Sequence, residues 1–431
     1  MKPLLEGLLS PFEPEAFDAE AAEHLLTRVE FGATPERIAE AHRLGLEETV
    51  AQLLEAATAP FDDSAQTDLI SLGRLDLAQA WWLERLAGEG GCSALRERLA
   101  LIWHGLFATS QAKVQDFALM LRQNSTQREL ALAPFPQLLR AMLVDPAMLV
   151  WLDGDQNRVG QPNENLAREL FELFALGIGN YTERDVLEAA RALSGWTVSG
   201  RAARHRQRWF DDQPKTIFDE TRNFDVDSLV DATTSQTACA RFIAGRLARE
   251  FVHPAPDPNR VEALADLLRA TQWDLERCLG QLLRSEWFFS PSNRRARIAS
   301  PVEWSSRARR QLGGGPAPLA RAEATSRMGQ DLLQPPSVKG WDGHRAWIGA
   351  ASWIERERAA LRWARDPATS LVFADVGRAD LPDAVFARLL PARPRPDWAA
   401  PLQRDLESMS REEALRTLVA ATLCSPEYQL I

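Results

Sequence analysis

The sequence predicts a mainly α fold, in which many helices form a large assembly of two packed lobes with a short irregular or hairpin insert between them. Leu, Ala, Arg and Glu recur at spacings of three and four residues along most of the chain, which is the period of an amphipathic helix. Runs of β-branched residues, which favour strands, are few. With 431 residues, 45% of them hydrophobic, the chain can form one large core or two coupled lobes.

Several helix starts are marked by a capping residue followed by proline. The capping oxygen accepts a backbone N–H, and proline at the first helical position has no hydrogen bond to lose. The pairs are Thr34–Pro35, Asp145–Pro146, Ser300–Pro301 and Ser425–Pro426. Residues 300–303, "SPVE", also have the pattern of a full capping box.

These signals and the apolar period together predict nineteen helices in chain order. Their ranges are 17–29, 35–42, 45–56, 66–87, 92–107, 114–122, 136–144, 163–176, 182–194, 226–231, 235–250, 258–269, 273–284, 300–311, 317–333, 351–362, 382–389, 400–407 and 410–423.

The segment from 197 to 225 loses the helical period and is polar and irregular, so we expect loops with a short hairpin there. This break predicts an N-terminal helical lobe over 1–198, an insert over 199–225 and a C-terminal helical lobe over 226–431.

Composition excludes several classes of function. A net charge of −10 argues against a general nucleic-acid or anionic-membrane binder, because such partners select clustered Lys and Arg. No stretch approaches the ~20 apolar residues of a membrane span. The N-terminus lacks the features of a signal peptide, so we expect a soluble, cytoplasmic protein. No phosphate loop, dinucleotide fingerprint, HExxH or GxSxG motif is present.

The four cysteines are scattered without the spacing of a metal site or a disulfide framework. They are Cys92, Cys239, Cys278 and Cys424.

Residues 160–196 concentrate charge on two predicted helices. On the first, the polar arc holds Glu164, Asn165, Arg168, Glu169 and Glu172, opposite an arc of Leu and Phe. The short link "GIGNY" folds the second helix back, which would bring Glu188 and Arg191 near that arc. The charges could instead be solvated i, i+4 pairs, each worth only about 0.3–0.5 kcal/mol.

A metal site is one hypothesis for these carboxylates, with Glu164, Glu169 and Glu172 as ligands and a divalent metal as the cofactor. Inward-facing Glu side chains hold metals in helix bundles, and an all-oxygen set favours Mg²⁺ or Ca²⁺ over iron. The sequence has Glu169-x-x-Glu172 but no Glu-x-x-His, which argues against a ferritin-like di-iron centre.

Two loops and one histidine complete the candidate site. The polar loop 156–165 offers Asn157, Arg158 and Asn163 as ligand-binding groups, although Asn163 is also a good helix cap. His104 lies seven positions after Glu97 on the same helix face, where the two could relay a proton or His104 could simply hydrogen-bond.

The second loop, "PPSVKGWDGHRAWI" at 335–348, places Lys339, Asp342, His344 and Arg345 around Trp341. An indole ring offers a broad stacking face, so Trp341 is a candidate ligand contact, whereas Trp347 is expected in the core.

Long stretches of the chain resemble the bacterial family named Domain of Unknown Function 1800. They are "HLLTRVEFGATPE" (24–36), "ERLALIWHGLFATS" (97–110), "WLDGDQNRVGQPNENLARELFELFALGIGNYTERDVLEAARALSGWTV" (151–198), "SPVEW" (300–304), "MGQDLLQPPSVKGWDGHRAWI" (328–348) and "SPEYQLI" (425–431). The resemblance covers nearly the whole chain. It implies a predominantly helical protein, often encoded beside an alkaline-phosphatase-like companion, but it implies no activity or substrate.

The chain departs from the pattern of that family at two places. Leu106 stands where members often have a second His after the Trp-His pair, and "DDQPK" at 211–215 replaces the piece HDxGxK. A role that relied on those histidines is therefore not expected here. Many members carry an export signal, which this N-terminus lacks.

Two hypotheses follow. The first is an enzyme or ligand-binding protein with a polar cleft between the lobes, where His104, Glu164, Arg168, Glu172 and Arg191 act in general acid–base or metal-assisted hydrolytic chemistry. The second is a non-catalytic helical scaffold or partner-binding protein, in which the charged motifs are structural networks. A solvent-reachable pocket with unused hydrogen-bonding capacity would favour the first, and complete mutual pairing the second.

Overall fold

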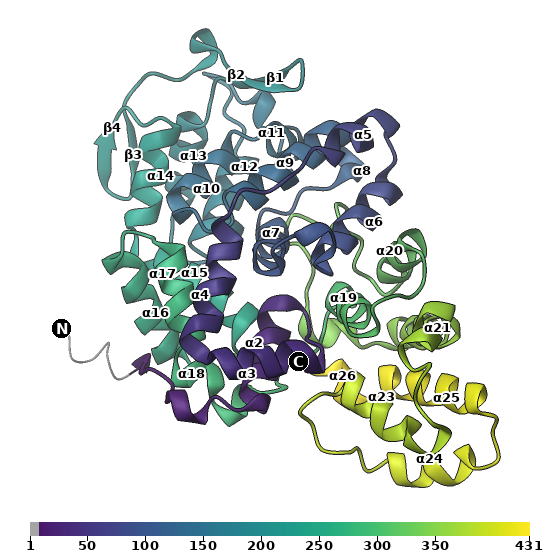
Figure 1. The fold of residues 1–431 in the computed structure, drawn as a ribbon. Helices are drawn as coiled ribbons and strands as arrows, with labels where there is room; N and C mark the ends of the chain where they lie inside the picture. The colour runs from purple at the N-terminus through teal and green to yellow at the C-terminus, as the bar shows by residue number, and fades with distance from the viewer. Residues whose placement is uncertain (1–7) are drawn as a thin grey trace.

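The computed structural model describes residues 8–431, and within that range the chain consists of 25 α-helices and two small β-hairpins (Figure 1). This confirms the predicted mainly α class. Residues 1–7, on which part of the expectation about a signal peptide falls, lie outside the described residues. No helix in the described range is long and apolar enough to cross a membrane.

The first half of the described chain forms helices that follow one another with short connections. They are α2 (Ala19–Glu30), α3 (Pro35–Leu44), α4 (Leu46–Thr58), α5 (Ala65–Leu72), α6 (Leu75–Leu86), α7 (Ala94–Leu106), α8 (Gln111–Val114), α9 (Phe117–Glu129), α10 (Phe135–Leu143), α11 (Pro146–Trp151), α12 (Asn165–Glu169) and α13 (Glu183–Ala192). A π-helical turn, η4 (Leu170–Ala175), continues α12.

Two hairpins form around the predicted insert where one was expected, and the first begins at Trp196, before the predicted boundary at 199. Strand β1 (Trp196–Ser199) pairs antiparallel with β2 (Ala202–His205), and β3 (Lys215–Ile217) pairs antiparallel with β4 (Glu220–Arg222). Both hairpins lie at the end of the molecule opposite the C-terminal helices (Figure 1).

The second half returns to helices. They are α14 (Val226–Ser235), α15 (Thr237–Phe251), α16 (Pro258–Ala270), α17 (Leu275–Leu283), α18 (Glu286–Phe289), α19 (Pro301–Leu312), α20 (Pro318–Arg327), α21 (Ala350–Arg365), α22 (Pro367–Val372), α23 (Leu381–Leu389), α24 (Ala399–Leu406), α25 (Arg411–Cys424) and α26 (Pro426–Gln429).

Three helix boundaries differ from the prediction for local reasons. The predicted helix 66–87 is two helices, because Gly73 adopts the left-handed conformation (φ 61°) and ends α5. The predicted helix 317–333 ends at Arg327, since Gly329 has a positive φ of 98°. The predicted helix 114–122 is also wrong: the first helix ends at Val114, and Asp116 caps a longer one, α9.

Apolar side chains form three buried clusters. The largest takes residues from 9 to 289 and so includes helices from both predicted lobes. A second is built from residues 299–431, and a third joins α5–α9 to Val302, Leu332 and Leu333. The predicted lobe boundaries at 198 and 226 stay a prediction.

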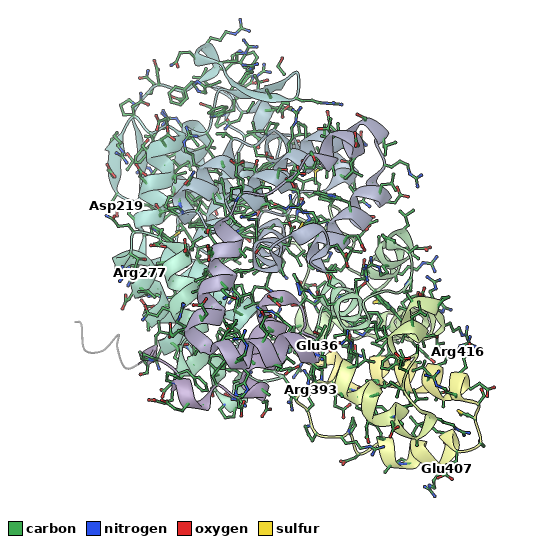
Figure 2. All side chains as sticks on the ribbon, viewed as in Figure 1. Glu36, Asp219, Arg277, Arg393, Glu407 and Arg416 are labelled. Carbon is green, nitrogen blue, oxygen red and sulfur yellow. The ribbon has the colours of Figure 1, made fainter. Side chains whose placement is uncertain are left out.

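Helix α2 links the N-terminal and C-terminal parts through buried charges. Glu23 is almost fully buried and accepts a hydrogen bond from Arg393 Nη2 at 2.7 Å. On α3, Glu36 accepts from Arg388 Nη1 at 2.9 Å. Figure 2 shows Glu36 and Arg393 where α2 and α3 meet the C-terminal helices. Because burial of one unpaired charge is costly, the Glu23–Arg393 pair fixes the C-terminal part against α2, whereas the Glu36 carboxylate is 73% exposed and adds little.

Candidate functional site

Helix α7 forms one wall of a charged cavity. Ser93 Oγ accepts the Arg96 backbone N–H and so caps the helix start. Residues at the helical spacing of three, four and seven positions then share one face, and this face carries Arg98, Ile102 and Gly105. All three line a cavity of about 230 Å³.

Helix α15 supplies the second wall. Arg246, Arg249 and Glu250 lie in its last two turns and also line the cavity. Their spacing of three and four residues places them on one face. Arginine near a helix C-terminus interacts favourably with the carbonyl dipoles of the last turn, which stabilises the position of this pair.

The loop after α20 closes the cavity, and two glycines permit its close approach. Gly340 has φ of 79°, and a Cβ built there would lie 2.6 Å from the Gly105 carbonyl oxygen. A Cβ on Gly105 would lie 2.9 Å from Arg246 Nη2. Trp341 and His344 follow Gly340 and line the cavity, so the predicted Trp-His-Gly and Gly-Trp-Asp-Gly-His motifs meet there.

Ion pairs connect α7 and α15 through the start of α19. Glu303, in the first turn of α19, accepts from Arg98 Nη1 at 2.8 Å and from Arg297 Nη1 at 3.3 Å. Although burial alone would raise its pKa, Arg297 and Arg98 lower the pKa of Glu303 to about 2. Glu303 also closes the capping box predicted at residues 300–303 by accepting the Ser300 backbone N–H. Arg297 Nη2 lies 3.2 Å from Glu250, which joins α15 to the network.

Positive charge exceeds negative charge in this cavity. Four arginines line it: Arg98, Arg246, Arg249 and Arg297. Three acids also line it, and one of them, Asp342, is ion-paired with the exposed Lys339, which lies outside the lining. The cavity therefore favours a negatively charged occupant.

Hydrogen-bonding capacity remains unused here. The Arg249 side chain lines the cavity and is exposed, and no hydrogen bond or ion pair joins its guanidinium to another described residue. The buried Nε of Arg246 lies 3.5 Å from Glu250 in an ion pair, whereas the Nε of Arg98 and the Nδ1 of His344 are buried without a hydrogen-bond partner. These are the open donors expected of a binding pocket, whereas a fully paired network would leave none.

His104 lies behind this cavity between two tryptophans. Its ring centroid is 5.4 Å from that of Trp82 and 5.6 Å from that of Trp341. Burial lowers the pKa of His104 to about 4, so the imidazole is neutral at neutral pH. The His104 ring thus packs against the Trp341 ring and helps to hold it in position.

The relay predicted between Glu97 and His104 does not form. Glu97 is fully buried and accepts from Trp82 Nε1 at 3.0 Å, Arg85 Nε at 2.8 Å and Arg128 Nε at 2.7 Å. No hydrogen bond joins it to His104 within the described chain. Its carboxylate neutralises two arginines instead.

The charged arc of residues 164–172 lies outside the cavity lining. Arg168 Nη2 donates to Glu164 at 2.9 Å and to Glu183 at 2.8 Å, and these side chains are 35 to 77% exposed. Glu172 accepts from the Tyr181 hydroxyl at 3.2 Å. This arrangement agrees with the alternative given for these residues, in which their charges form solvated ion pairs.

The carboxylates proposed as metal ligands are Glu164, Glu169 and Glu172. Within residues 8–431, no group of three or more His, Cys, Asp and Glu side chains is placed to hold a metal ion. Burial and the neighbouring Glu172 raise the pKa of Glu169. The metal hypothesis stays a prediction.

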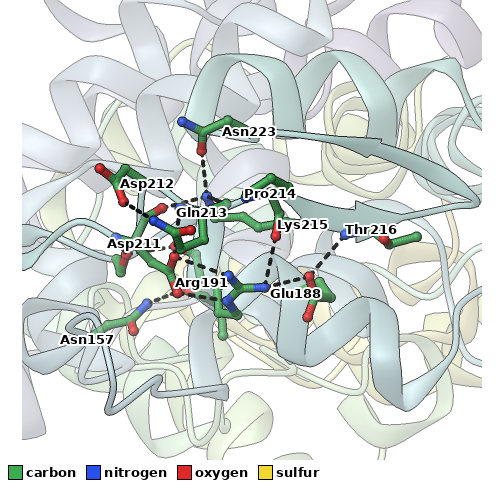
Figure 3. Close-up of polar contacts among 12 residues, drawn as sticks. Asn157, Glu188, Arg191, Asp211, Asp212, Gln213, Pro214, Lys215, Thr216 and Asn223 are labelled. Carbon is green, nitrogen blue, oxygen red and sulfur yellow. Dashed lines mark hydrogen bonds and ion pairs between the residues drawn. The ribbon is translucent and has the colours of Figure 1, made fainter.

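Arg191 belongs to a separate network, which ties α13 to the second hairpin (Figure 3). It donates to both carboxylate oxygens of Asp211, at 2.7 and 3.1 Å, and to Glu188 at 2.8 Å. Lys215 is fully buried, and its Nζ donates to the carbonyls of Asp211 and Gln213 and to Asn223 Oδ1. The "DDQPK" piece therefore holds the hairpin in place through complete mutual pairing.

The loop 156–165 is likewise held by its own contacts. Asn157 is buried, donates to the Ala190 carbonyl at 2.7 Å and accepts the Asn163 N–H at 3.1 Å. Asn163 Oδ1 accepts the Asn165 N–H, as predicted for a cap. The Arg158 guanidinium stacks over Trp209 at 4.2 Å. Of the two predicted loops, only 335–348 reaches the cavity, and its Arg345 is exposed.

Sequence reasoning missed the arginines of the cavity. Arg246 and Arg249 lie in an ordinary amphipathic helix, "ARFIAGRLAREF", and only their i, i+3 spacing singles them out. Arg98 pairs with Glu303 across 205 positions, which no local pattern reveals.

Comparison with protein-family models matches residues 24–430 to "Protein of unknown function (DUF1800)". Searches of curated proteins and of solved structures find no match to the chain.

Proposed function

Since the chain belongs to the DUF1800 family, whose function is unknown, its activity has to be inferred from the cavity itself, and we propose that the protein binds a small anionic ligand there. The observation that carries the proposal is the excess of arginine in the cavity together with the unpaired guanidinium of Arg249. Phosphate and carboxylate groups are the anions that arginine binds best, because its N–H groups match two oxygens at once.

We assign a role to each arginine from its position and its partners in the cavity wall. Arg98 and Arg297 are held by Glu303 and shape the interior. Arg246 is held by Glu250 through its Nε, so its Nη groups and the Arg249 guanidinium supply the open donors that contact the ligand. Trp341 covers the ligand, and His104 is a positioning residue beneath the Trp341 ring.

Hydrolysis by general acid–base chemistry is a second candidate function, and His344 favours it. The side chain lines the cavity, and its Nδ1 has no hydrogen-bond partner. Burial, Arg345, Arg297 and His253 lower the pKa of His344, so the neutral imidazole, which is the basic form, predominates at neutral pH.

The scaffold alternative is supported by the paired network around Arg191 and Lys215, which has the complete pairing expected of structure. The two roles fall in different parts of the molecule. The companion protein implied by the family resemblance stays a prediction.

Thermal unfolding with added inorganic phosphate, sulfate or acetate at constant ionic strength tests the proposal. A bound anion at about 100 times its Kd stabilises the native state by about 2.7 kcal/mol, which raises Tm. Arg249→Gln should weaken this response at least tenfold in anion concentration. Arg358→Gln, which removes an exposed charge on α21, is the matched control and should respond like the wild type. Equal responses of the two variants, or no stabilisation of the wild type, would contradict the proposal.

A further inference from the structure

A second cavity, of about 330 Å³, lies beside the arginine cavity and has the opposite character. Its lining includes Leu176, Phe242, Pro256 and Val261, and we refer to it as the apolar groove. Phe242 packs against the largest hydrophobic cluster.

Apart from Arg249, the two polar side chains that border the groove are already engaged. Asn180 Nδ2 donates to the carbonyls of Leu176 and Gly177, at 3.0 and 3.2 Å. Arg241 Nε is paired with Glu262. The groove therefore has little polar capacity to offer a ligand, whereas the arginine cavity has open donors.

Arg249 lines both cavities. Its guanidinium folds back over α15, because a Cβ built on Gly245 would lie 3.5 Å from Arg249 Nη1 and 3.8 Å from Val261 Cγ1. The charged group thus lies at the border between open donors on one side and apolar carbon on the other.

Helix α15 forms a continuous floor under this border. Ala238, Phe242 and Gly245 recur at spacings of three and four residues and face the groove. From Ala238 to Arg249 the helix rises about 17 Å. An extended tail lying along this face would reach from the arginine cavity to the far end of the groove.

We infer that the ligand is an amphiphile with a single anionic head group, carboxylate or phosphate, and an unbranched apolar tail that lies in the groove. The inference rests on the proposed function, because the arginine cavity holds the head. The head binds Arg246 and Arg249, and the tail leaves past Arg249 along Phe242 and Val261. Full burial of one methylene is worth about fourfold in affinity, so half-burial in an open groove is worth about twofold.

Isothermal titration calorimetry with the full chain tests the inference. The probes are methyl, butyl, hexyl and octyl phosphate, and the carboxylates of the same chain lengths, each below its micelle concentration. We expect affinity to rise about twofold per methylene in at least one series. The head group of the tighter series distinguishes a fatty acid from a phosphate ester. Octyltrimethylammonium, which has a cationic head, should not bind.

Variants separate the head from the tail. Phe242→Ser should flatten the chain-length dependence but leave methyl phosphate or acetate affinity within about twofold, whereas Arg249→Gln should weaken every probe. Leu371→Ser, which alters an apolar side chain that is 74% exposed on α22, is the control and should keep the wild-type slope. Circular dichroism checks that each variant folds.

The outcomes distinguish this inference from the proposed function. Methyl phosphate or acetate that binds with no gain on lengthening the tail would overturn the amphiphile and leave the anion site standing. A tail dependence that Phe242→Ser does not change would place the tail elsewhere and also overturn it. No binding of any anionic probe would overturn both.

Discussion

The pH dependence of stability gives a quantitative test of the buried position of His104. Its pKa is about 4 in the native state and about 6.5 in the unfolded chain. As the pH falls below 6.5, the imidazole of His104 in the unfolded chain binds a proton, whereas the same imidazole in the native state stays neutral. The unfolded state then binds more protons, so stability falls. Between pH 7 and pH 5 this single group costs about 2 kcal/mol.

The variant His104→Phe isolates this contribution. Phenylalanine keeps an aromatic ring between Trp82 and Trp341 but cannot take up a proton. Burial also lowers the pKa of His24 well below its usual value, but His24 contributes the same pH dependence of stability to the wild type and to the variant. Urea unfolding followed by tryptophan fluorescence at pH 7, 6 and 5 measures the free energy. We expect the wild type to lose about 2 kcal/mol more than the variant between pH 7 and pH 5. An equal loss in the two proteins would refute the buried, neutral state of His104.

Three further substitutions test the packing. Gly340→Ala places a Cβ 2.6 Å from the Gly105 carbonyl oxygen at a positive φ, so it should cost about 1–3 kcal/mol in urea unfolding and weaken anion binding by displacing the loop. Glu97→Gln removes the buried anion between Arg85 and Arg128 and leaves them only the partly exposed Asp63, so it should cost about 3–5 kcal/mol, seen as a large fall in the urea midpoint. Arg168→Ala removes only solvated ion pairs and should cost less than about 1 kcal/mol by the same measurement; a larger loss would contradict that description.

The helices were largely predictable, because their signals are local. The caps at Thr34, Asp145, Ser300 and Ser425 all begin helices in the structure. The errors arose where one residue overrides a period, as at Gly73, which ends α5 inside an otherwise helical pattern. The loss of helical period near residue 197 was visible in the sequence, but the two hairpins depend on pairing that short polar strands do not reveal.

The candidate site was predictable only in part. Trp341 and His344 line the cavity and His104 contacts Trp341, so two of the local motifs lie at the candidate site. The meeting of Arg98 with Glu303 depends on the tertiary packing of α7 against α19, which no sequence spacing contains.

Charge density was a poor guide to the site. The richest charged stretch, residues 160–196, places Arg168 in a solvated ion pair and Arg191 in a network that is fully paired. Unused donors, as on Arg249, are the better indicator, and they emerge only from the structure.

The central claim is that the arginine cavity holds an anion, and crystals soaked in selenate would test it most directly. Selenium gives an anomalous signal that locates a bound oxyanion from the diffraction data alone. We expect a selenate peak in the cavity, with oxygens within hydrogen-bonding distance, about 2.7–3.1 Å, of the Arg246 and Arg249 guanidinium groups. Selenate peaks elsewhere on the molecule, with none in this cavity at saturating concentration, would contradict the claim.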